Sequence, residues 1–461
     1  MKSIGMLAGL ILSLSPAAAR AQESPASTAG LVEENPIIRV LIVDSVTSMC
    51  AAPKTVWQVR TLTGKTLCEL KADEPVTIIL TGGELRLDRG ARSKAAEAAS
   101  DQGGGAVALG RDPVVLESAV KGGVLGIPKV PYGVGWWWES AEDRLYEGRI
   151  EVRPAGNGKF IVVAVLPLED YLRGVVPPEI GADSPLEAQC AQAVAARSAA
   201  ALALTSQIYA GPHYNICSDV ACQAFSGVTK CTALSDAAVT ATRGLVLMFD
   251  GKPVSAYYAS NCGGFTEDIR NVWPDRASDR AYWNTARFDG EGTCARDLAK
   301  EEDARKWIDD SPEVFCNPSI SKVPEWSKRN FRWTREVSAD ELTSFVARTR
   351  DIGRVLQIRP LKRGPSGRLI EAEFRGENGA LRVGPELAIR QVFNPPLKSA
   401  VFVADVKGDP ARPAAFIIKG AGWGHGVGMC QTGAIGMANA GKTCLEILKH
   451  YYPNAAVKKL Y

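Results

Sequence analysis

The chain is poor in histidine and lacks the short patterns that mark the commonest hydrolase sites. Its three histidines are His213, His425 and His450, and neither His-Glu-x-x-His nor Gly-x-Ser-x-Gly occurs. These absences exclude a zinc-protease helix and a nucleophile elbow. A Ser-His-Asp hydrolase would need His213 or His425 as its base without an elbow to present the serine, so we set this class aside.

The chain also has no large excess of one charge and few long apolar runs. The 54 basic and 51 acidic residues leave a net charge of +3, so charge gives no reason to expect nucleic acid or another polyanion as partner. Beyond the N-terminus no apolar stretch is long enough for a membrane helix, and we expect no transmembrane anchor. The Gly-x-x-x-x-Gly-Lys-[Ser/Thr] pattern of phosphate-binding loops is absent as well.

The N-terminus is typical of a secretory signal. Lys2 precedes an apolar run over residues 4–14, and small residues follow up to Ala21. The sequence therefore predicts a signal peptide over residues 1–21 and export to the periplasm or the cell-wall space. An uncleaved anchor is the alternative, but the run is short for a bilayer. The first cysteine is Cys50, which argues against a lipid anchor at the cut.

Cysteine, in contrast, is plentiful, with 11 residues that all lie beyond the predicted signal. An exported chain can form disulfides. Because the number is odd, at least one thiol must be free, buried or bound to a metal. The sequence does not define the pairings.

Composition and pattern predict a strand-rich α+β fold with a few helices. Glycine is abundant, with 44 residues, and Val, Ile and Thr recur in short runs. We expect a flexible lead over 22–35, an N-terminal strand-rich region over 36–144 and a second region over 145–461. Within the first region, residues 91–125 are rich in Ala and Gly without periodicity, which predicts an inserted or mobile loop. Strands are expected at 37–43, 54–90, 145–167 and 354–383, and helices at 184–207, 233–243, 339–351, 430–440 and 445–451.

The segment from Leu166 to Gly181 isolates one carboxylate on what should be a stiff support. Glu179 stands between Pro177-Pro178 and a glycine, just ahead of an Ala-rich helix. The prolines fix their own φ angles and restrict the residues before them, so they predict a corner. Ser184, Pro185 and Glu187 predict a capping box at the start of the following helix. A carboxyl group held in this way suits a general acid.

A glycine cluster over residues 422–433 presents Trp423, His425 and Gln431. Glycines let the backbone approach a ligand closely. The alternative is a tight turn between a buried strand and a helix, and the spacing alone leaves both open.

The pattern His213-x-x-x-Cys217-x-x-x-x-Cys222 could be half of a zinc site, since zinc favours thiolate and imidazole ligands. A disulfide that uses Cys217 or Cys222 is equally compatible with an exported protein. If Cys217, Cys222 and Cys262 all bound metal, an even number of cysteines would remain. Cys190 as a buried free thiol would restore the parity equally well.

Two further segments carry groups suited to sugar recognition. Residues 257–267 combine aromatic, hydroxyl and amide side chains, among them Tyr258 and Ser260, at the end of an expected strand. Trp136-Trp137-Trp138 could stack on a glycan. Large rings more often belong to the core, and this alternative remains open for the tryptophans.

Together these motifs resemble the SpoIID/LytB family over roughly residues 145–461. The resemblance rests on residues 166–179, on Leu186-Glu187-Ala188 through Ala195-Ala196-Arg197, on residues 260–267 and on residues 422–429. It implies a SpoIID-like fold with the catalytic Glu just before the Ala-rich helix. The family includes lytic transglycosylases that cut peptide-free peptidoglycan strands, and LytB-type amidase enhancers.

The resemblance also implies roles for single residues. Glu179 takes the catalytic position, and His213, Cys217 and Cys222 match a structural zinc site. Residues expected to bind the glycan are Arg197, Tyr258, Ser260, Trp423, His425 and Gln431. The chain departs from the family pattern at Ala221, where zinc-binding relatives can carry histidine, so Cys262 or water would be the fourth ligand. It departs again at Cys430, where the family usually has serine.

The prediction is thus an exported lytic transglycosylase that cleaves denuded glycan strands and leaves 1,6-anhydro-muramoyl ends, with Glu179 as general acid and base. One carboxylate suffices, because the muramic acid C6 hydroxyl supplies the nucleophile that a hydrolase must find elsewhere. The alternative is a non-catalytic glycan-binding protein that enhances a partner cell-wall amidase. A zinc hydrolase built on His213 lacks a general base, and thiolate-rich zinc sites are usually structural.

Overall fold

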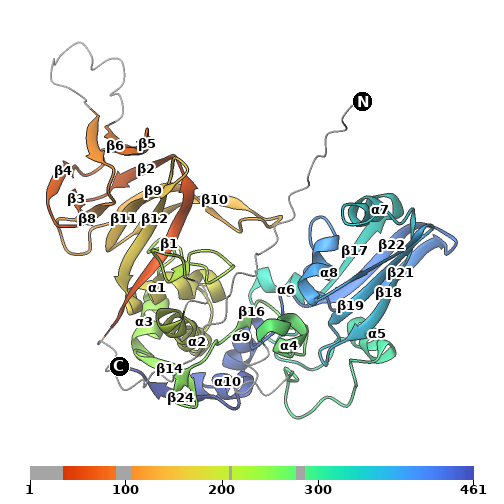
Figure 1. Ribbon diagram of the computed structural model, residues 1–461. Coiled ribbons are helices and arrows are strands. Elements are labelled where there is room, and N and C mark those ends of the chain that lie inside the picture. The colour runs from red at the N-terminus through yellow and green to blue at the C-terminus, as the bar shows by residue number, and fades with distance from the viewer. Residues whose placement is uncertain (1–34, 90–105, 207–209, 277–285) are drawn as a thin grey trace, which may run out of the picture.

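The computed structural model describes residues 35–89, 106–206, 210–276 and 286–461. These residues form an N-terminal unit of two sheets, a helical layer and a C-terminal lobe (Figure 1). The mixed, strand-rich α+β class predicted from the sequence is confirmed. The predicted signal peptide and the lead up to residue 34 lie outside the described residues.

The larger N-terminal sheet has seven strands. They are β1 (Ile37–Val46), β3 (Trp57–Thr61), β4 (Thr66–Leu70), β8 (Val114–Ser118), β11 (Arg149–Gly156), β12 (Lys159–Pro167) and β13 (Ile216–Cys217). Their order is β13-β1-β12-β11-β8-β3-β4, and every pair is antiparallel except β1 with β13. The boundary predicted between residues 144 and 145 is wrong, because β11 and β12 complete this sheet. The N-terminal unit extends to Pro167, which pairs with Ile37.

The second sheet packs against the first. It contains β2 (Ser48–Pro53), β5 (Val76–Thr81), β6 (Glu84–Asp88), β7 (Val107–Gly110), β9 (Leu125–Tyr132) and β10 (Ser140–Tyr146), in the order β10-β9-β2-β5-β6-β7. Trp57 and Leu116 of one sheet and Ile78 of the other belong to a single buried core.

The loop predicted at 91–125 is wrong for its second half, because this part of the chain forms β7 and β8. The sequence analysis missed these short strands because they lie in a segment rich in Ala and Gly.

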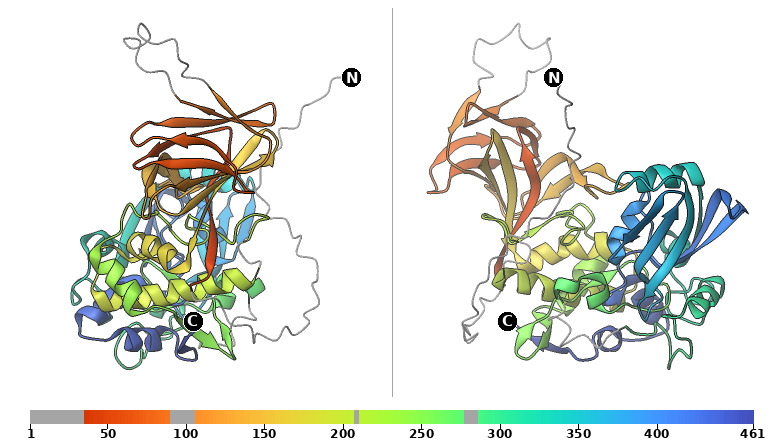
Figure 2. Two further views of the ribbon diagram at one scale, coloured as in Figure 1. Left: turned by 90° about the vertical axis from the view of Figure 1, so that its left-hand side faces the viewer. Right: turned by 45° about the vertical axis from the view of Figure 1, so that its right-hand side comes forward.

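A helical layer lies below the N-terminal unit and centres on one Ala-rich helix (Figures 1 and 2). Its helices are α1 (Leu168–Ile180), α2 (Leu186–Thr205), α3 (Ala233–Ala241), α4 (Ile269–Val272), α9 (Gln431–Asn439) and α10 (Cys444–Tyr451). Two small sheets complete it, β15-β14-β24 (Lys252–Pro253, Leu245–Phe249, Ala456–Lys459) and β16-β23 (Tyr258–Ala259, Met429–Cys430). The small side chains of α2 let α1, α3, α9 and α10 approach it closely from several sides. None of the helices within the described ranges is long and apolar enough to cross a membrane.

The predicted capping box of α2 does not form. Pro185 is the N-cap, and the Ser184 hydroxyl donates to the Ile180 carbonyl at 2.6 Å. The Glu187 carboxylate instead accepts the backbone N–H of Cys444 at 2.6 Å, which joins α2 to α10. Glu187 thus bonds to the backbone of a distant helix instead of to the start of its own helix.

The C-terminal lobe has its own core, which sequence reasoning did not separate from the rest. Its sheets are β17-β22-β21 (Arg332–Ser338, Arg412–Ala421, Phe402–Asp409) and β18-β19-β20 (Val355–Arg363, Leu369–Gly376, Gly379–Val383). Its helices are α5 (Glu301–Asp309), α6 (Glu325–Phe331), α7 (Ala339–Ala347) and α8 (Glu386–Val392). Phe374, Phe416 and Ile389 meet in this core. The helix expected at 339–351 forms as α7, which a capping box of Ser338 and Glu341 opens and which ends at Ala347.

Candidate functional site

A groove with a cavity volume of about 360 Å³ lies where the three parts of the molecule meet. The β9–β10 hairpin reaches from the N-terminal unit toward the C-terminal lobe (Figure 1). The hairpin lines one side of the groove, Arg390 of α8 another, and the end of α1 contributes Glu179. The other lining residues come from 220–223, 255–260, 423–425 and the start of α9.

Glu179 lies in the last turn of α1, so the predicted corner outside a helix is wrong. Pro177 and Pro178 are inside this helix. Proline has no N–H, which leaves the carbonyls four residues earlier free for other donors. The Arg173 carbonyl accepts the Cys231 thiol at 3.2 Å, and the Gly174 carbonyl accepts the Ser226 N–H at 3.1 Å. The two prolines thereby tie α1 to the segment that faces Glu179.

That segment supplies the shortest hydrogen bond to the Glu179 carboxyl group. Oε1 accepts the Ala224 N–H at 2.7 Å, and Oε2 accepts Nε2 of Gln431 at 3.4 Å. Burial raises the pKa of Glu179 to about 7, although the bonds from Ala224 and Gln431 oppose the shift. At neutral pH a large fraction of this carboxyl group is therefore protonated and can donate a proton.

Four residues predicted to bind substrate gather around Glu179. Strand β16 pairs in parallel with β23, which sets Tyr258 opposite Met429 and places Gln431 at the start of α9. Asn261 and Trp423 exchange two backbone hydrogen bonds of 3.1 and 2.8 Å. Tyr258, Ser260, Trp423 and Gln431 all line the groove, and the buried Ser260 hydroxyl has no hydrogen-bond partner among the described residues.

His425 also lines the groove, but it is a neutral packing residue rather than a base. Its Nδ1 accepts the Val427 N–H at 3.0 Å, and its ring lies 4.8 Å from that of Trp273. Burial, together with the positive charges of Arg368 and Arg390, lowers the pKa of His425 to about 3. The lone pair that a base would use is already engaged at neutral pH.

The three consecutive tryptophans line the groove, as does Trp423. Trp137 is 51% exposed, and the rings of Trp138 and Trp423 lie 6.3 Å apart. The Asp219 carboxylate holds the start of this loop by accepting the N–H groups of Gly133 and Val134 at 2.8 and 2.9 Å. The stacking interpretation left open by the sequence therefore has the geometry it needs.

The predicted zinc site at His213, Cys217 and Cys222 is wrong in this structure. Cys217 and Cys222 form a disulfide, the alternative that the sequence left open. Disulfide sulfurs are not thiolates and do not act as zinc ligands. The His213 side chain is exposed, and its carbonyl accepts Nε of Arg39 at 2.7 Å. The disulfide closes the loop that carries Asp219, and this loop forms one wall of the groove.

Arg197 does not bind substrate in the groove, contrary to the prediction. Its side chain is fully buried, and Nε and Nη2 each lie 2.8 Å from a carboxylate oxygen of Glu169. Glu169 also accepts the hydroxyl of Tyr461 and the N–H of Gly244. Arg197 is thus part of an internal network that joins α1 and α2 to Tyr461, beyond the last strand, and to Gly244.

Sequence reasoning missed several groups in the site. Ala224 acts through its backbone N–H, which no side-chain pattern reveals. Gln192 accepts Nε2 of Gln431 at 3.2 Å and so orients the amide beside Glu179. Arg276 and Arg390 line the groove, where Arg276 donates to the Tyr257 hydroxyl at 2.7 Å and Arg390 lies over the Trp136 ring. Both bring positive charge to the groove, and that of Arg390 is partly offset because its Nη1 lies 3.6 Å from the Glu386 carboxylate.

Within the described residues, one group has the composition and closeness of a metal site. Cys262, Asp289, Cys316 and Cys430 are buried, and their ligand atoms all lie within 4.8 Å of one another. None of them was predicted as a primary ligand.

The fold and the groove define a class of protein: an α+β chain whose aromatic cleft, among the described residues, is lined by one carboxyl group with a raised pKa. Comparison with known sequences gives two family matches. The family described as "Stage II sporulation protein" matches residues 156–249, which include Glu179, and a "Domain of unknown function (DUF8618)" matches residues 267–428.

Three relatives extend the match. An uncharacterized protein of Brachyspira hyodysenteriae is 29% identical over 64% of this chain and 68% of its own length. The Amidase enhancer of Bacillus subtilis is 27% identical over 62% of this chain, which spans 40% of that relative. Stage II sporulation protein D of Bacillus amyloliquefaciens is 26% identical over 70% of this chain and 82% of the relative. These matches support the resemblance to the SpoIID/LytB family that the motifs predicted.

Proposed function

We propose that this protein is an exported peptidoglycan lytic transglycosylase that cleaves peptide-free glycan strands and leaves 1,6-anhydro-muramoyl ends. The observation that carries the proposal is Glu179, a carboxyl group with its pKa raised to about 7 in an aromatic groove. A general acid works best when its pKa lies near the working pH. The glycan substrate lies outside the cytoplasm, which agrees with the predicted signal peptide.

The composition of the groove favours lytic cleavage over hydrolysis. Glu179 is the one carboxylate among the described residues that line it. A glycoside hydrolase ordinarily uses two carboxyl groups, with the second as nucleophile or as base for water. A lytic enzyme needs no second group, because the C6 hydroxyl of muramic acid attacks its own anomeric carbon.

The proton transfers balance on Glu179 alone. Its carboxyl proton passes to the glycosidic oxygen as the C1–O bond breaks, and the departing sugar leaves with a new hydroxyl group. The C6 oxygen then bonds to C1, and its proton passes to the Glu179 carboxylate. The residue returns to its starting state, and no water is consumed. Gln431 and Ala224, which donate to this group, stabilise its charged intermediate form.

The rest of the groove suits a denuded strand. Exposed aromatic faces such as Trp137 can pack against sugar rings. Removal of a stem peptide leaves the lactyl group of muramic acid with a free carboxylate. Arg276 at the groove carries a guanidinium group of the kind that binds such an anion.

The decisive experiment compares the products formed from peptide-free glycan strands by the wild type and by Glu179→Gln. We expect 1,6-anhydro-muramoyl ends from the wild type and intact strands, still bound, from the variant. New reducing ends would indicate hydrolysis and contradict the lytic proposal.

A second candidate function is supported by the relative named Amidase enhancer. In that case the groove would bind glycan without cutting it, and the protein would stimulate a cell-wall amidase. Stimulation of a purified amidase by wild type and Glu179→Gln alike, with no anhydro ends from either, would favour this function.

The pH profile of kcat/KM gives an independent prediction. The acid must begin protonated, so activity should be constant at low pH and fall as the pH rises through about 7, the pKa of Glu179. The Gln431 amide, which donates to the Glu179 carboxylate at 3.4 Å, lowers that pKa. Gln431→Met should therefore move the falling limb to higher pH. Absence of a falling limb near pH 7 in the wild type would argue against Glu179 as the titrating acid.

Loss of an exposed groove ring should weaken binding of the glycan. Trp137→Ala removes a stacking face and should cost about 1–2 kcal/mol, or roughly five- to thirty-fold in affinity. Trp326, which is 41% exposed and does not line the groove, provides the matched control. The measurement is the affinity of each variant for peptide-free strands, and Trp326→Ala should leave it unchanged. Equal losses of affinity in Trp137→Ala and Trp326→Ala would contradict a stacking role.

A further inference from the structure

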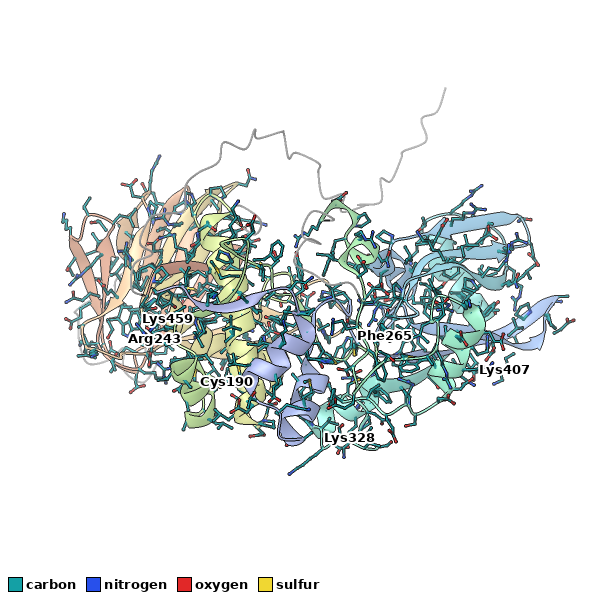
Figure 3. The ribbon with its side chains drawn as sticks, turned by 90° about the horizontal axis from the view of Figure 1, so that it is seen from below. Cys190, Arg243, Phe265, Lys328, Lys407 and Lys459 are labelled. Atoms are coloured by element: carbon teal, nitrogen blue, oxygen red, sulfur yellow. A yellow bond between two sulfur atoms is a disulfide. The ribbon has the colours of Figure 1, made fainter. Side chains whose placement is uncertain are left out.

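Three thiols and one carboxyl group converge from four distant segments of the chain. Cys262 follows β16, Asp289 precedes α5, Cys316 lies between α5 and α6, and Cys430 ends β23. All four are buried, with their ligand atoms within 4.8 Å of one another. Phe265, three residues after Cys262, marks the region between the helical layer and the C-terminal lobe (Figure 3).

The spacing of the sulfur atoms fits a shared metal rather than a disulfide. Sγ of Cys262 and Sγ of Cys316 lie 3.8 Å apart. A disulfide would bring two sulfurs to about 2.05 Å. Two thiolates on a tetrahedral zinc ion, with bonds of about 2.3 Å, are separated by about 3.8 Å. The observed distance equals this separation, so the two thiols, which now contact each other, could both bind one zinc ion without moving apart.

Backbone and hydroxyl donors already surround the group as they surround metal ligands. Sγ of Cys430 accepts the N–H groups of Cys262 and Gly433 at 3.2 and 3.3 Å. The Asp289 carboxylate accepts the Cys316 N–H at 3.1 Å and also the Tyr451 hydroxyl. These bonds fix the orientation of one thiolate and of the carboxylate.

The position of Gly433 also follows from this cluster. A Cβ at position 433 would lie 2.5 Å from Oδ1 of Asp289 and 2.2 Å from the Tyr451 hydroxyl oxygen. Glycine at this position therefore lets the start of α9 approach the carboxylate.

We propose that Cys262, Asp289, Cys316 and Cys430 together bind one Zn²⁺ ion. Four protein ligands leave no open position, which is the arrangement of a structural zinc site. Binding releases protons from the thiols and places a divalent cation among acidic groups that would otherwise be costly to bury together. The site accounts for the cysteine at position 430, where the family resemblance predicts serine.

The zinc would brace the floor of the groove without touching substrate. Cys430 directly precedes Gln431, whose amide donates to Glu179. Cys262 lies two residues after Ser260, on the other side of the β16–β23 pair. One ion would thus lock together the two segments that present the predicted glycan-binding residues. The proposal does not depend on what reaction the groove performs.

Metal analysis and zinc X-ray absorption on the purified full chain test the site without mutation. We expect about one zinc per chain, with three sulfur ligands at about 2.3 Å and one oxygen at about 2.0–2.2 Å. Absence of zinc, or a shell with two sulfurs and an imidazole nitrogen, would overturn the proposal. So would a disulfide between any two of Cys262, Cys316 and Cys430, found by peptide mass mapping.

Variants then assign the ligands. Cys316→Ser and Asp289→Asn should lower the zinc content well below one per chain, whereas Cys217→Ser/Cys222→Ser and Cys190→Ser should keep it. Cys190, on α2, is a buried cysteine apart from the cluster (Figure 3). If a ligand variant does not fold, refolding of the wild type with Co²⁺ should give the charge-transfer bands of a tetrahedral thiolate site. Loss of zinc in the Cys217/Cys222 variant, or absence of those bands, would contradict the assignment.

Discussion

Replacement of Glu179 by glutamine should lower kcat/KM for glycan cleavage by at least about 10²- to 10⁴-fold, the usual contribution of a positioned acid and base. The amide keeps the shape of the carboxyl group, and its oxygen can still accept the Ala224 N–H. It has no proton to give to the glycosidic oxygen and cannot take one from the C6 hydroxyl. Release of anhydro-muramoyl ends from peptide-free strands measures the loss.

The matched control is Glu187→Gln, the same chemical change on the neighbouring helix. Glu187 accepts the Cys444 N–H and does not line the groove, so its variant should cleave nearly as fast as the wild type. Glu179→Gln should unfold at the same or a higher temperature, because it removes a carboxyl group whose ionisation is disfavoured by burial. Near-normal cleavage by Glu179→Gln would remove this residue from the mechanism.

Most of the residues that the sequence singled out with Glu179 lie with it in one groove, and the reason is physical. The predicted binding residues lie in two motifs, residues 257–267 and 422–433, that are far apart in the chain. The parallel pairing of β16 with β23 brings these two motifs together. Groups that act through the backbone, such as Ala224, leave no trace in a side-chain pattern. The sequence analysis did not expect α1 to continue through Pro177 and Pro178. It does so because groups elsewhere in the chain donate hydrogen bonds to the two carbonyls that these prolines leave without a donor.

The metal ligands were misplaced because nearness along the chain was taken as a guide to nearness in space. His213, Cys217 and Cys222 have suggestive spacing, yet the two cysteines are disulfide-bonded. Cys262 and Cys430 are 168 positions apart and share a hydrogen bond. Long-range convergence of this kind depends on how β16, β23 and α9 pack, and cysteine spacing carries no information about it.

The wrong prediction for Arg197 has a different cause, and the composition of α2 could have prevented it. A helix as rich in alanine as α2 is apolar on nearly every side, so it is expected to be buried throughout. A charged residue within it then requires a buried partner of opposite charge. Glu169, in the first turn of α1, is that partner.

Removal of the positive member of this pair should be one of the most destabilising single changes in the chain. Arg197→Met leaves the Glu169 carboxylate buried without its main counter-charge, which typically costs about 3–5 kcal/mol in the free energy of unfolding. Burial by itself would raise the pKa of Glu169, but the bonds from Arg197, Tyr461 and Gly244 outweigh it and lower the pKa. Urea unfolding at neutral pH measures the loss.

A second substitution, at Glu169, shows whether Arg197→Met destabilises the protein by loss of the ion pair or by loss of packing. Glu169→Gln/Arg197→Met contains no uncompensated charge, so it should be more stable than Arg197→Met alone. The sign of the pH effect gives a second check. With its pKa lowered in the folded state, wild-type Glu169 stabilises the protein above its unfolded pKa, and this contribution is lost as the pH falls. In Arg197→Met the carboxylate is no longer favoured by folding, so the deficit relative to the wild type should shrink as the pH falls. A deficit that is independent of pH and unchanged in the double variant would show that Arg197 stabilises the helices by packing alone.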